Sequence, residues 1–308
     1  MHFKDYLKKC RERYDLTQEE LVHELSGFDE ALFSSLDTVT LSRWELGKSS
    51  PNVAKQIRAI HYFQTKDNLV FPCFDETESE MIEKHICKTG MLNLSGKNQS
   101  LILNFPSSIS LDELTVHQLK DSEMINEKIK IALDLNKEFS HNHSLISAEQ
   151  FLEWTHYPHN LFLTCEYNKQ FFGLLFTLRL KPKSFDKLMN FEMTQSNLSA
   201  EDFAGNDEMG CNFILAFFAM NDMAANLLLI RYFACLISSQ RSIGEVGAMS
   251  THEDAIKLME TVHLQPYKSK AFGKSLVRHS YRASLSDVLI NETMVKMLFA
   301  KEDCSEGQ

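Results

Sequence analysis

The chain has 308 residues and a formal net charge of −10 at pH 7. A single hydrophobic core stops growing at roughly 250–300 residues, so this length predicts a small domain and a larger one. The negative charge argues against a protein that coats nucleic acid or anionic membrane by bulk electrostatics. The charge is uneven, because residues 1–66 carry ten basic and ten acidic residues and the whole deficit therefore lies beyond residue 66.

The longest apolar stretches do not have the character of membrane segments. FILAFFAM is short and MAANLLLIRYFACLIS is interrupted by polar residues, while the first residues are charged where a signal peptide needs an apolar run. The seven cysteines form no Cys-x-x-Cys pair, and several lie in apolar surroundings typical of reduced core thiols. The sequence therefore predicts a cytoplasmic protein without a membrane segment, a disulfide framework or a zinc finger.

The first 66 residues have the pattern of a small helical domain. Thr17 and Glu20 form a capping-box pattern and Leu16 and Leu21 a hydrophobic staple, so a helix is predicted to begin at Thr17. Apolar residues at helical spacing predict one helix before it and another after Pro51, through Phe3, Leu7, Cys10 and Tyr14 and through Val53, Ile57 and Ile60.

The stretch VTLSRWELGKSSP, residues 39–51, predicts a short helix that ends near Leu46. Gly47 accepts the left-handed conformation that ends helices, and Pro51 cannot continue one. Leu41 and Trp44 are three residues apart and share a face that packs. The opposite face is too polar for a core and too small for a substrate pocket, so we expect it to bind a partner.

LTQEEL followed by TLSRWELGKSSP resembles the helix-turn-helix of Cro and phage repressors, the XRE family, over roughly residues 3–63. The resemblance implies a homodimer that binds a palindromic operator in double-stranded DNA, with the helix of residues 38–46 in the major groove. It implies base contacts from Thr38, Val39, Ser42 and Arg43. It implies phosphate contacts from Gln18, Thr40 and Lys48.

The side chains agree with these roles. Arg43 can donate to both guanine acceptors, Val39 can contact a thymine methyl, and Gln18 stands at a helix N-terminus where a phosphate is favoured. The alternative is that these are solvated residues of an ordinary helical bundle. The usual turn of 3 to 4 residues is replaced by Gly27–Asp37, whose apolar residues predict an extra short helix.

Residues 67–110 are predicted to form a connector, and residues 111–300 a larger domain of strands and helices. The clearest strand pair is LFLTCEY with FFGLLFTLRL, joined by a polar turn, and NLLLIRYFACLISS predicts a central helix because it is apolar nearly all round. IGEVGAM and SLVRHSYRASL predict further strands. The predicted fold class is thus an all-α helix-turn-helix domain followed by a mixed-sheet α/β domain.

The order of these elements resembles the GNAT acyltransferase fold over about residues 111–285. In that family a Gly-bearing loop with the pattern Q/R-x-x-G-x-G/A binds the pyrophosphate of acyl-coenzyme A. The matching loop here, MNDMAANLL, has no Gly and contains Asp222, and Met259 stands where a general-acid Tyr is often found. We therefore expect no catalytic residue and no cofactor. A ligand cleft is expected instead at Ala219, Met220, Asn221, Met223 and Asn226.

Three functions remain open from the sequence. The first is a transcription regulator whose GNAT-like domain binds a small-molecule effector, forms the dimer, or both. The second is an N-acyltransferase with a DNA-targeting helix-turn-helix module, and the third a phage-type or antitoxin-like protein whose larger domain binds another protein. A metal site at His141, His143, His156 and His159 is an alternative without interleaved acidic or Cys ligands, so no metal is expected.

Overall fold

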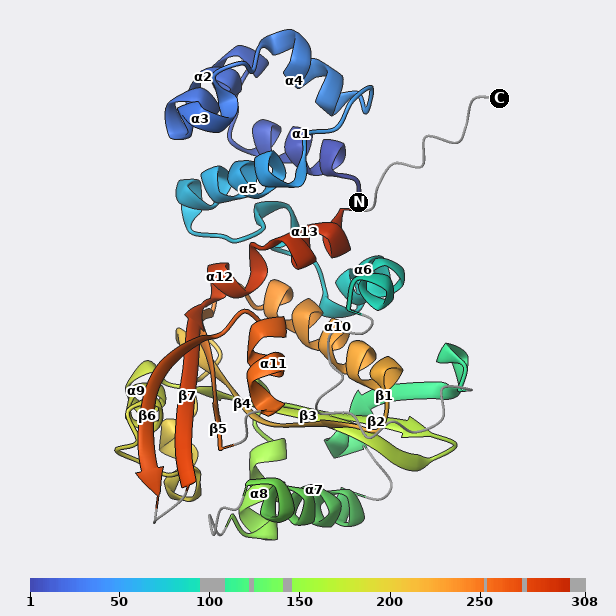
Figure 1. Cartoon of the computed structure of the whole chain (residues 1–308), viewed down its shortest axis with the longest axis vertical. Coiled ribbons are helices and arrows are strands. Elements are labelled where there is room, and N and C mark those ends of the chain that lie inside the picture. Colours follow the sequence, from blue (N-terminus) through green and yellow to red (C-terminus); the bar gives the residue numbers. More distant parts are fainter. Residues whose placement is uncertain (95–108, 122–124, 141–145, 252–253, 273–275, 300–308) are drawn as a thin grey trace. The chain divides into compact units, whose positions relative to one another are not determined.

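The computed structural model describes residues 1–94, 109–121, 125–140, 146–251, 254–272 and 276–299 (Figure 1). Contacts divide the chain into two compact units, each described by itself below. The helical unit comprises residues 1–93, 233–240 and 289–308, and the sheet unit comprises residues 94–232 and 241–288. The sequence placed the boundaries at residues 66 and 110, whereas the helical unit also takes in residues 67–93 and two later segments.

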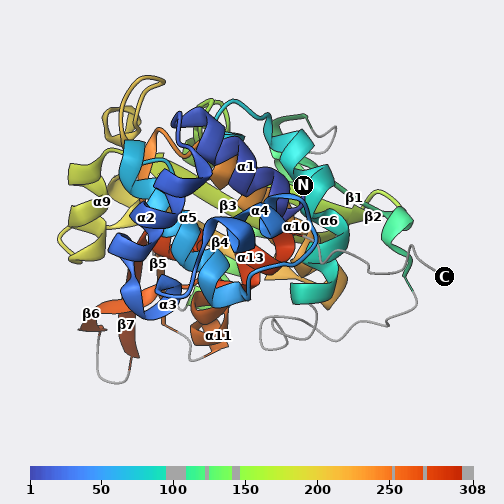
Figure 2. The same ribbon diagram turned by 90° about the horizontal axis from the view of Figure 1, so that it is seen from above.

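The helical unit begins with five helices, which Figure 2 shows from above: α1 (Phe3–Arg13), α2 (Gln18–Phe28), α3 (Glu30–Phe33), α4 (Thr38–Glu45) and α5 (Val53–Asp67). It continues with the short 3-10 helix η1 (Pro72–Phe74), most of α6 (Ser79–Leu94) and, near the end of the chain, α13 (Glu292–Leu298).

Local capping explains where these helices begin. The capping box predicted at Thr17 is present, because the Glu20 backbone N–H donates to the Thr17 hydroxyl at 3.2 Å and the Thr17 N–H donates to the Glu20 carboxylate at 2.8 Å. Asp29 caps α3 and Asp37 caps α4 with a single hydrogen bond each, because their carboxylates accept from the backbone N–H groups of Leu32 and Thr40. The extra short helix predicted between residues 27 and 37 is therefore confirmed as α3.

Aromatic side chains from both ends of the chain share the core of the helical unit. The Tyr6 ring is buried, with its centroid 6.2 Å from that of Phe63 and 5.1 Å from that of Phe299. The Phe3 and Phe299 rings meet edge to face at 5.3 Å. Gln240 accepts from the Phe71 backbone N–H at 2.8 Å and donates to the Phe71 carbonyl at 3.0 Å. The late segments are thus part of this core.

The sheet unit is built on seven strands: β1 (Leu114–Gln118), β2 (Leu161–Tyr167), β3 (Gln170–Leu180), β4 (Gly210–Ala219), β5 (Ile243–Ser250), β6 (Gln265–Phe272) and β7 (Leu276–Ser284). Their order is β1-β2-β3-β4-β5-β7-β6. The β4–β5 pair is parallel and the others are antiparallel. The predicted β2–β3 hairpin is confirmed, and Asn168 and Lys169 have the positive φ angles of a tight hairpin turn.

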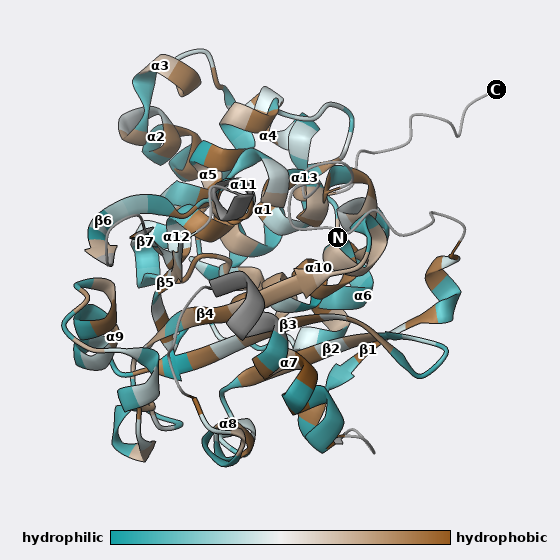
Figure 3. Ribbon diagram, turned by 60° about the horizontal axis from the view of Figure 1, so that its bottom comes forward, coloured by the Kyte–Doolittle hydropathy of each residue, from teal (hydrophilic) through white to brown (hydrophobic). Residues whose placement is uncertain are grey.

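Helices and short 3-10 turns precede, connect and follow these strands: η2 (Leu111–Glu113), η3 (Leu119–Asp121), α7 (Ile125–Ser140), α8 (Ala148–Thr155), α9 (Pro182–Met189), η4 (Gln195–Asn197), η5 (Ala200–Asp202), α10 (Asp222–Ser238), α11 (Asp254–Thr261) and α12 (Leu285–Leu289). Residues 233–238 of α10 belong to the helical unit. The predicted central helix is α10. Figure 3 shows its hydrophobic colouring beside that of β3 and β4.

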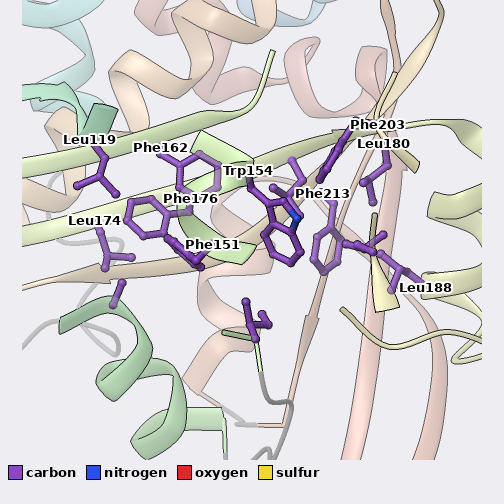
Figure 4. Packing of buried hydrophobic residues seen from close by; sticks show 14 of the residues in the cluster. Leu119, Phe151, Trp154, Phe162, Leu174, Phe176, Leu180, Leu188, Phe203 and Phe213 are labelled. Carbon is purple, nitrogen blue, oxygen red and sulfur yellow. The ribbon is translucent and has the colours of Figure 1, made fainter. Parts of the chain in front are cut away.

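One face of the sheet carries a large aromatic core, drawn in Figure 4. The rings of Phe162 on β2 and Phe176 on β3 lie 4.9 Å apart, and Phe151 of α8 packs edge to face on Phe162 at 5.2 Å. Trp154 of α8 and Ile129 of α7 belong to the same cluster. Burial of these large side chains explains why α7 and α8 cover this face.

Gly247 on β5 allows close packing of α9 on the sheet, and this supports a stability prediction. A methyl group added at Gly247 would lie 2.6 Å from Cζ of the buried Phe185 ring and 3.0 Å from Sδ of Met189. Gly247→Ala should therefore lower the free energy of unfolding by about 1–3 kcal/mol. Urea unfolding of the full chain measures the change.

Gly244 on the same strand provides the matched control. A methyl group there would meet nothing closer than 3.8 Å, an ordinary van der Waals contact. Gly244→Ala should therefore leave stability unchanged or raise it slightly. Equal losses in the two variants would show that the contact with Phe185 does not determine the packing.

Candidate functional sites

Helix α4 packs through one face and exposes the other. Leu41 and Trp44 are buried, as predicted from their spacing. Thr38, Val39 and Arg43 are exposed, with the Val39 side chain 64% accessible, while Thr40 and Ser42 are partly buried. The Asp37 carboxylate accepts from the Thr40 N–H at 2.7 Å and fixes the start of the helix. Three of the four residues predicted to contact bases, Thr38, Val39 and Arg43, therefore lie on the solvent side of a capped helix, and Ser42 is partly buried.

A buried carboxylate fixes the end of α4. Arg11 of α1 donates to both oxygens of Glu45, from Nε at 2.6 Å and from a terminal nitrogen at 3.2 Å, and donates to the Leu16 carbonyl at 2.8 Å. Only 5% of the Glu45 side chain is accessible. Hydrogen bonding to Glu45 is the main cause of a raised pKa at Arg11. Two-point contact of this kind sets orientation as well as distance.

Gln18 also contacts this carboxylate. Its side-chain amide donates to Glu45 Oε2 at 2.7 Å, so α1, α2 and α4 meet at one anionic group. Because an amide nitrogen carries two hydrogens, one N–H of Gln18 is used here. The phosphate contact of Gln18 stays a prediction, as do those of Thr40 and Lys48.

The charge around α4 changes once these contacts are counted. Arg11 neutralises Glu45, which was the acidic residue within 38–58, and Arg58 is paired with Asp29 at 2.7 Å. Lys55 lies over the Trp44 ring at 5.8 Å. The charges that remain within residues 38–58 are therefore positive: Arg43 and Lys48 are exposed and Lys55 is partly buried. The exposed carboxylate of Asp37 lies just before them, at the N-cap of α4.

Breaking the Arg11–Glu45 contact should destabilise the helical unit. Arg11→Met leaves a buried carboxylate without its cation, so we expect the free energy of unfolding to fall by about 2–4 kcal/mol. The double variant Arg11→Met/Glu45→Gln removes the uncompensated charge and should recover part of the loss. Thermal and urea unfolding of the full chain, followed by circular dichroism, measure both.

Lys8 supplies the control for this prediction, because it lies on the same helix in an exposed ion pair with Glu12 at 3.9 Å. Lys8→Met should have little effect on stability. If Arg11→Met were as mild as Lys8→Met, the buried pair would not fix α4.

In the sheet unit, the parallel strands β4 and β5 separate partway along. Their pairing ends at Ile214 and Ala248, although β4 continues to Ala219 beside β3 and β5 continues to Ser250 beside β7. Leu215 is a bulge, since Phe176 pairs with Ala216 and Thr177 with Ile214. Helix α10 begins directly after β4, at Asp222. The predicted mixed-sheet α/β fold of this unit is confirmed.

The five residues of the expected ligand cleft lie at this point but differ in exposure. Ala219, Asn221 and Asn226 are buried, and Met220 and Met223 are partly exposed. The Asn221 side chain accepts from the Ala224 N–H at 2.8 Å and thus caps α10. In the first turn of α10, a side chain of the protein therefore occupies a backbone donor that a bound anion would otherwise use.

The proposed general-acid position also lies in the core. Met259 on α11 is 4% accessible, so it fills space among apolar neighbours. A buried hydroxyl of α10 is used within the protein, because Tyr232 donates to Asn212 at 2.7 Å and Asn212 donates to Thr177 at 3.1 Å. This network joins α10 to β4 and β3.

The sheet unit contains a second polar cluster, which sequence patterns do not indicate. Lys128 of α7 pairs with Glu166 of β2, and His117 of β1 lies 3.0 Å from the same carboxylate oxygen. Lys128 and Glu166 are both buried. The three residues are far apart in the sequence and follow no motif. The pairing of β1 with β2 brings His117 to Glu166, and the ion pair of Lys128 adds α7 to the cluster.

Of the four histidines considered as metal ligands, the two that lie in the described residues contact different partners. His156 contacts the Leu152 carbonyl at 2.8 Å and His159 the Asn206 side chain at 2.6 Å. His141 and His143 lie outside the described residues. Within the described ranges, no group of three His, Cys, Asp or Glu residues could hold a metal ion. Nor does any helix in those ranges combine the length and apolar character needed to cross a bilayer.

Comparison with known proteins gives structural neighbours only. No family model and no curated protein matches the chain. An N-acetyltransferase from Staphylococcus aureus Mu50 is 9% identical, with a TM-score of 0.36 over 56% of this chain and 97% of its own. Ribosomal-protein-alanine N-acetyltransferase from Brucella melitensis is 14% identical, with a TM-score of 0.37 over 56% and 98%. An aminoglycoside N(6')acetyltransferase from Legionella pneumophila is 10% identical, with a TM-score of 0.36 over 59% and 98%.

Proposed function

We propose that this chain is a sequence-specific DNA-binding regulator that acts as a homodimer, with α4 entering the major groove. The observation that carries the proposal is the geometry of α4. Its inner face is buried through Leu41 and Trp44, and its end is fixed by the Arg11–Glu45 pair. Its outer face keeps Thr38, Val39 and Arg43 exposed. A rigid helix with an exposed, mixed polar and apolar face matches what base recognition requires.

The exposed side chains suit base edges. Arg43 can donate two parallel hydrogen bonds to guanine, and Val39 offers an aliphatic surface for a thymine methyl. Lys48 follows α4 closely, because its backbone N–H donates to the Arg43 carbonyl at 2.9 Å. A lysine there suits a phosphate, which contributes affinity without sequence information.

Selection from a random duplex library with the full-length protein would give the preferred operator and test the proposal. On that operator, Arg43→Ala should cost about 1–3 kcal/mol of binding free energy and relax the preference at one base pair. Lys48→Ala should weaken all duplexes alike. Equal losses on operator and random DNA for both variants would contradict the assignment, and so would selection without any enriched sequence.

The homodimer follows from the small number of available cations. One copy of residues 1–66, which are neutral overall, makes too few phosphate contacts for tight binding, so two copies are expected on half-sites about one helical turn apart in a palindrome. Light scattering of the full chain should give the mass of a dimer, and a duplex with two half-sites should bind much more tightly than one with a single half-site. A monomer with full affinity for one half-site would refute this.

The second candidate is N-acyl transfer, and a specific observation favours it. The β4 bulge and the separation of β4 from β5 occur at the place where the GNAT resemblance implies an acyl-coenzyme A site.

The residues at this place fit a ligand that is less anionic than acyl-coenzyme A. Asp222 adds negative charge at the start of α10, and Asn221 occupies one of the N–H groups of the first turn. We propose that the sheet unit binds a small-molecule effector there.

Titration calorimetry with acetyl-coenzyme A distinguishes the two candidates. We expect no binding at physiological concentrations, and no free thiol released in the presence of amine acceptors, because the pyrophosphate lacks backbone partners and faces Asp222. Micromolar binding with turnover that is lost in Met223→Glu would establish the enzyme instead. Met209→Glu is the control, since Met209 is exposed beside the opposite end of β4.

A further inference from the structure

Two cysteines of the helical unit that are distant in the sequence lie in contact. Sγ of Cys10 on α1 is 2.9 Å from Sγ of Cys73 in η1, across 63 residues of sequence. Cys10 is completely buried, and Cys73 is partly exposed. Cys73 also lies 3.7 Å from the Tyr6 carbonyl. The two sulfur atoms are therefore close enough to bond after a movement of less than about 1 Å.

The two thiols have different surroundings, and each suits one step of thiol oxidation. The hydrogen bond from Cys10 lowers the pKa of Cys73; burial opposes this, and the positive charges of Lys9 and Arg13 support it. Burial raises the pKa of Cys10, and its contact with Cys73 adds to the shift. Cys73 is thus the thiol that becomes a nucleophile, and Cys10 is the one that keeps its proton.

We infer that Cys10 and Cys73 form a reversible thiol–disulfide site that hydroperoxides oxidise. In the first step the Cys73 thiolate attacks a peroxide oxygen, so that an S–O bond forms, the O–O bond breaks and hydroxide or alkoxide leaves. In the second step the Cys10 sulfur loses its proton and attacks Cys73, so that the S–S bond forms and the sulfenic oxygen leaves as water. Two thiols are oxidised and one peroxide is reduced.

Cys165, Cys211 and Cys87 lack this combination. Burial raises the pKa of Cys165 and of Cys211 to about 12, and both are buried in the sheet unit. Cys87 on α6 is partly exposed, but burial raises its pKa as well. A low-pKa, accessible thiol beside a second thiol is the arrangement that favours a disulfide over further oxidation.

The disulfide would close a loop that contains α2, α3, α4 and α5. Such a cross-link restricts the unfolded chain, and the restriction grows with loop length. Cys10 is also the neighbour of Arg11, which contacts Glu45 at the end of α4. Oxidation would therefore stabilise the helical unit by a cross-link on α1, the helix whose Arg11 also orients the exposed face of α4. This inference stands independently of DNA binding.

The test uses the purified full chain, reduced and then treated with hydrogen peroxide. Intact mass should fall by two hydrogen atoms, and tryptic digestion should yield one cross-linked product in which a peptide bearing Cys10 is joined to a peptide bearing Cys73. Dithiothreitol should reverse both changes. The oxidised chain should melt roughly 5–10 °C higher than the reduced chain.

The controls separate this site from general thiol damage. Cys87→Ser should keep the cross-link, whereas Cys10→Ser should stop at a Cys73 sulfenic acid that dimedone traps. The inference would be overturned if the peroxide-treated wild-type chain gave only sulfinic or sulfonic Cys73, or a cross-link to another cysteine. It would also be overturned if the Cys10 and Cys73 thiols both stayed reactive to maleimide. The wild-type measurements decide the matter even if a variant fails to fold.

Discussion

The Glu45 carboxylate is the interaction on which the geometry of the helical unit depends. A helix of eight residues such as α4 is too short to be stable in isolation, so its position must come from packing. Leu41 and Trp44 supply apolar contact, but apolar contact alone allows a helix to rotate or slide. The hydrogen bonds from Arg11 and Gln18 to Glu45 remove that freedom. The direction of the exposed face is therefore set by three helices that meet at one charge.

Sequence patterns predicted the parts of the fold that local interactions determine. The capping box at Thr17, the short helix α3 and the β2–β3 hairpin were all predicted, because each depends on residues a few positions apart. Strand β6 was missed. It contains Pro266, Lys268 and Lys270 instead of an alternating apolar pattern, which is what a solvated edge strand requires to avoid pairing with other chains. Helix α9 was also missed, because the stretch that contains it was interpreted only as polar.

The candidate sites divide in the same way. The exposed and buried faces of α4 followed from helical spacing, so Arg43 and Val39 were placed correctly on the solvent side. The role of Asn221 did not follow, since a cap and a ligand contact need the same residue type at the same place. The contacts of Gln18 with Glu45, and of Cys10 with Cys73, span 27 and 63 residues. Contacts at such separations leave no periodic signal and become visible only in the folded chain.

The uneven distribution of charge along the chain bears on the proposed function. Residues 1–66 are neutral, and the remainder carries the whole charge of −10. This acidic remainder of the chain, which includes residues 67–93 of the helical unit, disfavours non-specific association with DNA, because phosphate contacts supply most of that binding. In the proposed function, affinity would then depend on a few cations near α4 and on base contacts made by its exposed face. Such a protein gains discrimination at the cost of affinity per copy, and two copies on a palindrome restore the affinity without adding non-specific charge.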